Sequence, residues 1–93
     1  QEIGMFVIPN FEKYSDTQKE LLYMLGDGGH HSEAEVLKVI GDPIAKRSRA
    51  RRHINALRIK MSEHSHPYTV TSEVLDRNRT YFRIVRVVSS DDR

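Results

Sequence analysis

Residues 46–60 combine basic charge with helical spacing. This stretch, KRSRARRHINALRIK, holds seven lysine or arginine residues and no acidic residue. Four apolar residues recur at intervals of four, three and four, which places them on one face of a helix: Ala50, Ile54, Leu57 and Met61. Four polar residues follow the same rhythm on a roughly opposite face: Arg47, Arg51, Asn55 and Arg58. One helix over about residues 46–62 would therefore pack on a core and present arginine and asparagine outward.

Arginine and asparagine in such a row are suited to reading nucleic-acid bases. In the major groove, arginine pairs bidentately with guanine and asparagine with adenine, so Arg47, Arg51, Asn55 and Arg58 are the expected base-reading residues. Six further basic residues are expected to hold phosphates, four in the helix and two in a later turn: Lys46, Arg49, Arg52, Lys60, Arg77 and Arg79. The alternative is an ordinary solvated face. Solvated helix faces usually carry both acidic and basic residues, whereas this stretch is only basic, which favours a nucleic-acid-binding surface.

Length and composition exclude several classes of protein. A chain of 93 residues forms one small domain without room for a separate catalytic lobe, and its formal net charge is only +2. The absence of cysteine excludes disulfides, thiolate zinc sites and cysteine nucleophiles. No apolar run approaches the roughly 20 residues of a membrane span, and no signal-peptide pattern opens the chain. We expect a cytoplasmic, nucleoid-associated protein that does not enter membranes, and the start at Gln1 suggests a fragment.

Histidine pairs are the remaining candidates for metal or catalytic chemistry. His30 and His31 are adjacent, and His64 lies two residues before His66. Two histidines in a loop supply half a metal site at best, and no carboxylate or cysteine set completes four ligands. Such pairs are usually solvated. No glycine-rich phosphate loop follows a strand, and no serine lies in a nucleophile-elbow pattern, so we expect no catalytic residue, metal or cofactor.

Two capping boxes predict the helices that must support the basic one. Ser15 with Gln18 opens a helix that should run to about Leu25. Ser32 with Glu35 opens a second, shorter helix that should end at Gly41. The third helix could begin at Asp42-Pro43, or at Ser48 after an irregular stretch, and should run to about residue 62.

Strand patterns lie at both ends of the chain. Residues 5–8 form a short apolar run that could be an edge strand or a disordered lead-in. After Pro67 the apolar period changes from 3.6 to 2, and a turn at residues 76–79 separates two β-prone runs over 68–88, which predicts a hairpin. Residues 89–93 should be a frayed tail. The predicted fold class is α+β: a three-helix helix-turn-helix core with a hairpin wing and a short N-terminal strand, which is a winged helix with its core at about 15–88.

Residues 53–61, HINALRIKM, resemble the H-I-x-x-L-R-x-K pattern in the recognition helix of OmpR/PhoB-type response-regulator effector domains. Residues 32–37 (SEAEVL) resemble that family's S-R-E-E-L-L second helix, and residues 17–22 its first helix less closely. Residues 68–70 (YTV) and 81–84 (YFRI) resemble its two wing strands. The resemblance covers about residues 15–88. His53 in this string is expected to be partly buried, either structural or beside a phosphate.

The resemblance implies a transcription regulator that binds double-stranded DNA, with the third helix in the major groove and the wing on the adjacent backbone or minor groove. In that family the loop between the second and third helices commonly contacts RNA polymerase, and here the loop is short. Thr80 replaces the glycine before the wing tyrosine, and the wing turn is longer. A small module usually binds as a homodimer or in tandem. The N-terminal strand, first helix and hairpin edge are candidate contacts.

Two further readings use the same residues. A winged helix can serve as a protein-interaction module without binding DNA, because fold does not imply function. The basic run could also contact RNA, although sequence-specific RNA recognition favours exposed aromatic side chains. The tyrosines and phenylalanine of the predicted hairpin are more simply explained as core residues.

Overall fold

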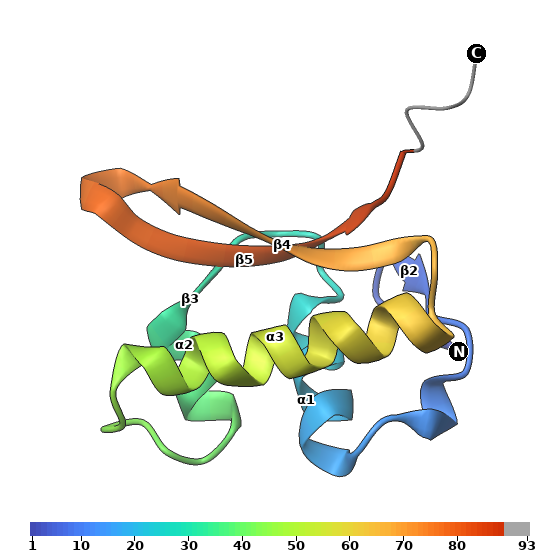
Figure 1. The fold of residues 1–93 in the computed structure, drawn as a ribbon, viewed down its shortest axis with the longest axis horizontal. Helices are drawn as coiled ribbons and strands as arrows, with labels where there is room; N and C mark the ends of the chain where they lie inside the picture. The colour runs from blue at the N-terminus through green and yellow to red at the C-terminus, as the bar shows by residue number, and fades with distance from the viewer. Residues whose placement is uncertain (89–93) are drawn as a thin grey trace.

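A computed structural model describes residues 1–88, and the predicted frayed tail at 89–93 lies outside the described residues. The described part is an α+β domain with three helices and two small antiparallel sheets (Figure 1). In chain order the elements are β1 (Glu2–Ile3), β2 (Phe6–Val7), η1 (Phe11–Lys13), α1 (Asp16–Leu25), β3 (His31–Ser32), α2 (Glu33–Val39), α3 (Arg47–His64), β4 (Tyr68–Leu75), η2 (Asp76–Asn78) and β5 (Arg79–Arg86).

Both capping boxes are confirmed. The Ser15 hydroxyl accepts from the Gln18 amide at 3.2 Å, and the Gln18 side chain accepts from the Ser15 amide at 3.0 Å. The same reciprocal pair joins Ser32 and Glu35, at 3.2 and 2.9 Å. Each box satisfies two helix-end amides that would otherwise have no partner, and each cap contributes about 1 kcal/mol. α1 ends at Leu25 as expected.

The basic helix α3 begins at Arg47, one residue before the later of the two expected starts. Asp42 does not open it, because residues 42–45 form a separate turn in which the Ala45 amide donates to the Asp42 carbonyl at 3.1 Å. Gly41 ends the preceding helix with a φ of 81°, as its position suggested. α3 continues to His64, two residues beyond the expected end.

The C-terminal hairpin pairs as the period-2 pattern predicted. β4 and β5 are in register from Tyr68 opposite Arg86 to Leu75 opposite Arg79. The turn between them has positive φ at Arg77 (53°) and Asn78 (64°). β3 adds a third strand that the sequence analysis missed, with His31 opposite Phe82, so the order is β3-β5-β4. Two residues are too few to show an alternating pattern.

The N-terminus is a two-stranded hairpin rather than the single strand expected at residues 5–8. β1 pairs with β2 through Ile3 opposite Phe6, and β2 covers only Phe6–Val7. The expectation was wrong because Glu2 and Gly4 interrupt any apolar run before Met5. Ile3 and Ile8 are both buried in the core, so this hairpin is packed on the domain and is not a disordered lead-in.

The core lies where α3 meets the other elements. Figure 1 shows the β4–β5 hairpin along one side of α3, with α1 and α2 on another side. The four apolar residues predicted for the inner face of α3 are all fully buried: Ala50, Ile54, Leu57 and Met61. They pack with leucines of α1, with Val36 and Leu37 of α2, and with Phe82 of β5. Among the described helices, none has the length and apolar character needed to cross a membrane.

We expect Gly4→Ala to destabilise the domain more than Gly41→Ala. Both glycines have positive φ, 59° and 81°, so alanine at either position meets a left-handed strain of about 1–2 kcal/mol. At Gly4 an added Cβ would also lie 2.3 Å from the Gly26 carbonyl oxygen, whereas at Gly41 it would meet nothing within 4 Å. Urea denaturation of the two variants tests this. Equal losses in the free energy of unfolding would show that the hairpin does not depend on this close approach.

Candidate nucleic-acid interface

The polar row of α3 lies beside its buried stripe and not opposite to it. At 100° per residue, Arg47, Arg51, Asn55 and Arg58 centre about 90° from the apolar stripe. The face turned fully away from the core instead carries Ser48, Arg52, Ala56 and Ile59, all exposed. The expectation of an opposite face was therefore wrong. The row points along the flank of α3, where other elements can reach it.

Arg58 is bonded within the protein. Its Nε donates to the Val70 carbonyl of β4 at 2.7 Å, and Nη2 donates to the Ser72 hydroxyl at 3.0 Å. Its Nη1 donates to the Asn55 side-chain oxygen at 2.5 Å. The bonds to Val70 and Ser72 tie α3 to the hairpin, and the bond to Asn55 lies within α3. Of the two residues, Asn55 is exposed and Arg58 is half-buried.

Arg49 and Arg51 are held more weakly, by ion pairs. Arg51 Nε lies 3.2 Å from Glu33 Oε2, and Arg49 Nε lies 3.0 Å from Asp42 Oδ2. The Arg51 side chain is 56% exposed, although the Glu33 side chain is only 15% exposed. The Glu33 Oε2 atom has no hydrogen bond within the described residues, so its contact with Arg51 is electrostatic without hydrogen-bond geometry. Ion pairs between exposed side chains contribute about 0.2–1 kcal/mol, so a phosphate can compete for Arg49. Glu33 is too buried for its pair with Arg51 to belong to this class.

Six of the ten expected contact residues are basic side chains with neither an ion pair nor a side-chain hydrogen bond in the part of the chain that the structure describes. They are Lys46, Arg47, Arg52, Lys60, Arg77 and Arg79. All are exposed except Lys60, which is half-buried. They come from two segments, α3 and the turn of the hairpin, and thus give the domain basic groups that internal contacts do not neutralise.

The start of α3 and the turn of the hairpin share one surface hollow. The hollow has a volume of about 500 Å³. Arg47 lines it from α3, Asn78 and Arg79 from the turn, and Ser32 and Glu33 from the start of α2. Residues from three separate parts of the chain are thereby brought to one site.

His53 adds little charge of its own. Burial lowers its pKa, and the nearby Arg49 and Arg52 guanidiniums lower it further. The half-buried position matches the expectation from sequence. The neutral imidazole is favoured because protonation would add a positive charge to a group of arginines.

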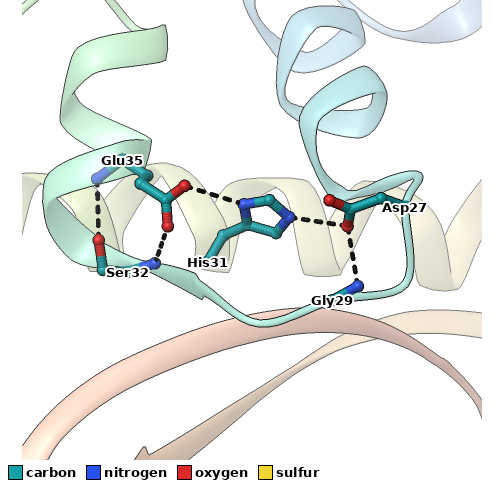
Figure 2. Close-up of polar contacts among 5 residues, drawn as sticks. All are labelled: Asp27, Gly29, His31, Ser32 and Glu35. Carbon is teal, nitrogen blue, oxygen red and sulfur yellow. Dashed lines mark hydrogen bonds and ion pairs between the residues drawn. The ribbon is translucent and has the colours of Figure 1, made fainter.

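His31 links the turn after α1 to the start of α2 (Figure 2). Its Nε2 lies 2.8 Å from Asp27 Oδ1, and its Nδ1 lies 3.2 Å from Glu35 Oε2. The side chain is 11% exposed, so the expectation that both loop histidines are solvated was wrong for His31. His30 is exposed and lies against Glu73 of β4. The missed signal was the placement of one carboxylate four residues before His31 and another four after it.

Burial alone would lower the pKa of His31, but hydrogen bonds with Asp27 and Glu35 outweigh it and raise the pKa above its usual value. Hydrogen bonding to the Ser32 amide and to His31 lowers the pKa of Glu35. The hydrogen bond with His31 also lowers the pKa of Asp27. The favoured state is thus an imidazolium between two carboxylates. Within residues 1–88 there is no group of three or more side chains able to hold a metal ion.

We expect Arg58→Ala to lower the free energy of unfolding by about 1–2 kcal/mol, because it leaves the Val70 carbonyl and Ser72 hydroxyl without their partner. Arg58→Lys should recover little of this loss, since one ammonium cannot replace a guanidinium that donates in three directions. Arg52→Ala is the matched control, and its effect should stay within about 0.5 kcal/mol. Chemical denaturation measures all three. An Arg58→Ala protein as stable as the control would contradict a structural role for Arg58.

The domain should lose stability as pH rises through the folded pKa of His31. Because the folded pKa is raised, the contribution of the imidazolium is complete below the unfolded value of about 6.5 and disappears above the folded one. Asp27→Asn removes one carboxylate partner, so it should flatten this slope. Glu12→Gln, at an exposed position, should leave it unchanged. Denaturation at a series of pH values, with an NMR titration of the His31 ring, tests the prediction. A slope that is the same in the wild type and in Asp27→Asn would refute it.

The candidate interface therefore consists of the basic first half of α3, the arginine-bearing turn of the hairpin and the hollow between them. His31 links the start of α2 to Asp27 in the turn after α1. Comparison with known proteins finds no match for this chain among family models, curated proteins or solved structures.

Proposed function

We propose that this domain is a winged helix that binds double-stranded DNA and acts in transcription regulation. The proposal places α3 in the major groove and the β4–β5 hairpin, as the wing, on the adjacent backbone or minor groove. Its fold part is supported by the order of elements: two short helices, a longer basic helix, and a hairpin whose second strand also pairs with β3. A helix of this kind fits the width of the B-DNA major groove.

The observation that carries the proposal is the set of basic side chains without internal partners at one end of α3 and in the wing turn. Lys46, Arg47 and Arg52 come from α3, and Arg77 and Arg79 come from the turn. A protein that neutralises phosphates with such groups releases condensed counterions, and this supplies much of the affinity for duplex DNA. The net charge of the whole chain is only +2, so it is the clustering of these residues that favours DNA.

Base reading in this proposal falls mainly to Arg51 and Asn55. The Arg51 side chain is 56% exposed, so its Nε can stay beside Glu33 Oε2 while its other guanidinium donors face a base. Asn55 is exposed, and its amide nitrogen remains free to donate while its oxygen accepts from Arg58. Arg58 would have to break three internal bonds before it could reach a base. It therefore orients Asn55 rather than reading bases itself.

A protein-contact function is the second candidate, and Ile44 favours it. This side chain is 94% exposed in the turn between α2 and α3. That turn corresponds to the loop that contacts RNA polymerase in OmpR/PhoB-type domains. One exposed isoleucine is common on protein surfaces, so the alternative of a protein-contact module without DNA binding has weaker support than DNA binding.

We expect tight duplex binding at low salt, with log affinity falling linearly as log salt rises. Fluorescence anisotropy with a random duplex and a random RNA hairpin measures this. Lys46→Ala/Arg52→Ala should reduce the salt slope by about two, because each of these side chains would neutralise about one phosphate charge on the duplex.

The matched control is Lys13→Ala/Arg86→Ala, which removes the same charge elsewhere. Lys13 lies in η1, and Arg86 pairs with Tyr68 at the base of the hairpin, away from the turn. The control should keep the wild-type slope. If both double variants reduce the salt slope equally, the overall charge of the domain attracts the duplex and no defined interface binds it. No binding at low salt would instead favour the protein-contact function.

A further inference from the structure

The hollow between α3 and the wing turn has two arginines with no competing partner. Arg47 and Arg79 both line it, and neither forms an ion pair or a side-chain hydrogen bond with any residue in 1–88. Both are exposed. Two guanidiniums that face one space repel each other unless an anion lies between them, so the hollow favours a negatively charged group.

The two carboxylates that also line the hollow are already compensated. Glu35 accepts from the Ser32 amide at 2.9 Å and lies against His31 at 3.2 Å. Glu33 is paired with Arg51 at 3.2 Å and is largely buried. Arg51 offsets Glu33, and Glu35 shares His31 with Asp27. Arg47 and Arg79 are the charged side chains of the hollow that have no partner of opposite charge among residues 1–88.

The flanking groups suit a phosphate. Asn78 and Thr80 line the hollow beside Arg79, and Ser32 lines it from the start of α2. Their amide and hydroxyl groups can donate to phosphate oxygens. Arginine presents two parallel donors to a phosphate, and two arginines can therefore grip one group from two sides.

We propose that one backbone phosphate of bound duplex DNA sits in this hollow, held jointly by Arg47 and Arg79. The inference rests on the proposed function and refines it. In such a complex, one DNA backbone separates the major groove, which holds α3, from the minor groove, which the wing contacts. That DNA backbone must pass between α3 and the wing. The hollow lies between α3 and the wing turn, where this DNA backbone would cross the protein.

This assignment changes the expected role of Arg47 from base reading to positioning. A phosphate contact fixes the register of a protein on DNA and carries no sequence information of its own. By holding one phosphate from both sides, Arg47 and Arg79 would fix the distance between α3 and the wing on the duplex. The side chains that read bases, further along α3, would then meet a defined set of base pairs.

The test measures binding of the full chain to a random duplex and to a duplex obtained by site selection, between about 50 and 200 mM salt. For each phosphate that the protein no longer neutralises, the drop in affinity across this salt range should shrink by about threefold. Arg47→Ala/Arg79→Ala should show this change on both duplexes. Each single variant should show a smaller change, because the remaining arginine still holds the same phosphate, so the double effect should exceed the sum of the two single effects.

Lysine variants separate charge from structure. Arg47→Lys/Arg79→Lys keeps both charges and should retain most of the salt slope, whereas Lys13→Ala/Arg86→Ala should leave the hollow unaffected. A titration with inorganic phosphate, followed through the arginine Nε–Hε NMR signals, shows whether free phosphate binds there too. Shifts of the Arg47 and Arg79 signals in millimolar phosphate, with the exposed Arg86 signal unchanged, would support the site, and shifts of all three alike would contradict it.

The outcomes separate the two proposals. If the wild type binds duplex with a steep salt slope and Arg47→Ala/Arg79→Ala keeps that slope, the phosphate site is overturned while DNA binding stands. If Arg47→Ala changes which bases are preferred, Arg47 reads bases and the positioning role is overturned. If the wild type shows no salt-dependent duplex binding, both proposals fail together.

Discussion

The burial of one apolar stripe on α3 determines the rest of the structure. Ala50, Ile54, Leu57 and Met61 have essentially no exposed surface. Elements on more than one side contribute to this burial, because α1 and α2 pack against the helix and the hairpin lies alongside it. Once the stripe is buried, every other side chain of α3 has a fixed direction. The basic residues near its start are thereby placed beside the turn of the hairpin.

The features that the sequence predicted well are those with strong local signals. The capping boxes at Ser15 and Ser32 identified two helix starts correctly, because each requires particular side chains at a fixed spacing. The hairpin was also correct, since eight alternating residues in each strand show a clear period. The first residue of α3 was harder to place. Its N-cap, Lys46, makes no side-chain capping bond that a sequence pattern could reveal.

The features that the sequence did not predict depend on distant contacts. β1 and β3 have two residues each, and pairing with other strands defines them more than their own pattern does. The internal partners of Arg49, Arg51 and Arg58 were also hidden, because Asp42, Glu33 and Val70 become neighbours only after folding. A helical wheel ranks residues by direction but does not show what stands in that direction. For this reason the sequence gathered nine basic residues and Asn55 into one candidate group but did not show which of them have partners within the protein.

The bond from Arg58 to the Val70 carbonyl also bears on how two copies of this domain can meet. β4 lies at the edge of its sheet, with β5 as its partner in the described sheet. An edge strand offers backbone groups to any extended segment that approaches, and natural proteins often protect such edges with charged side chains. Here a guanidinium occupies an acceptor in the middle of the strand. A second chain that paired with β4 at this point would have to displace the Arg58 guanidinium from the Val70 carbonyl.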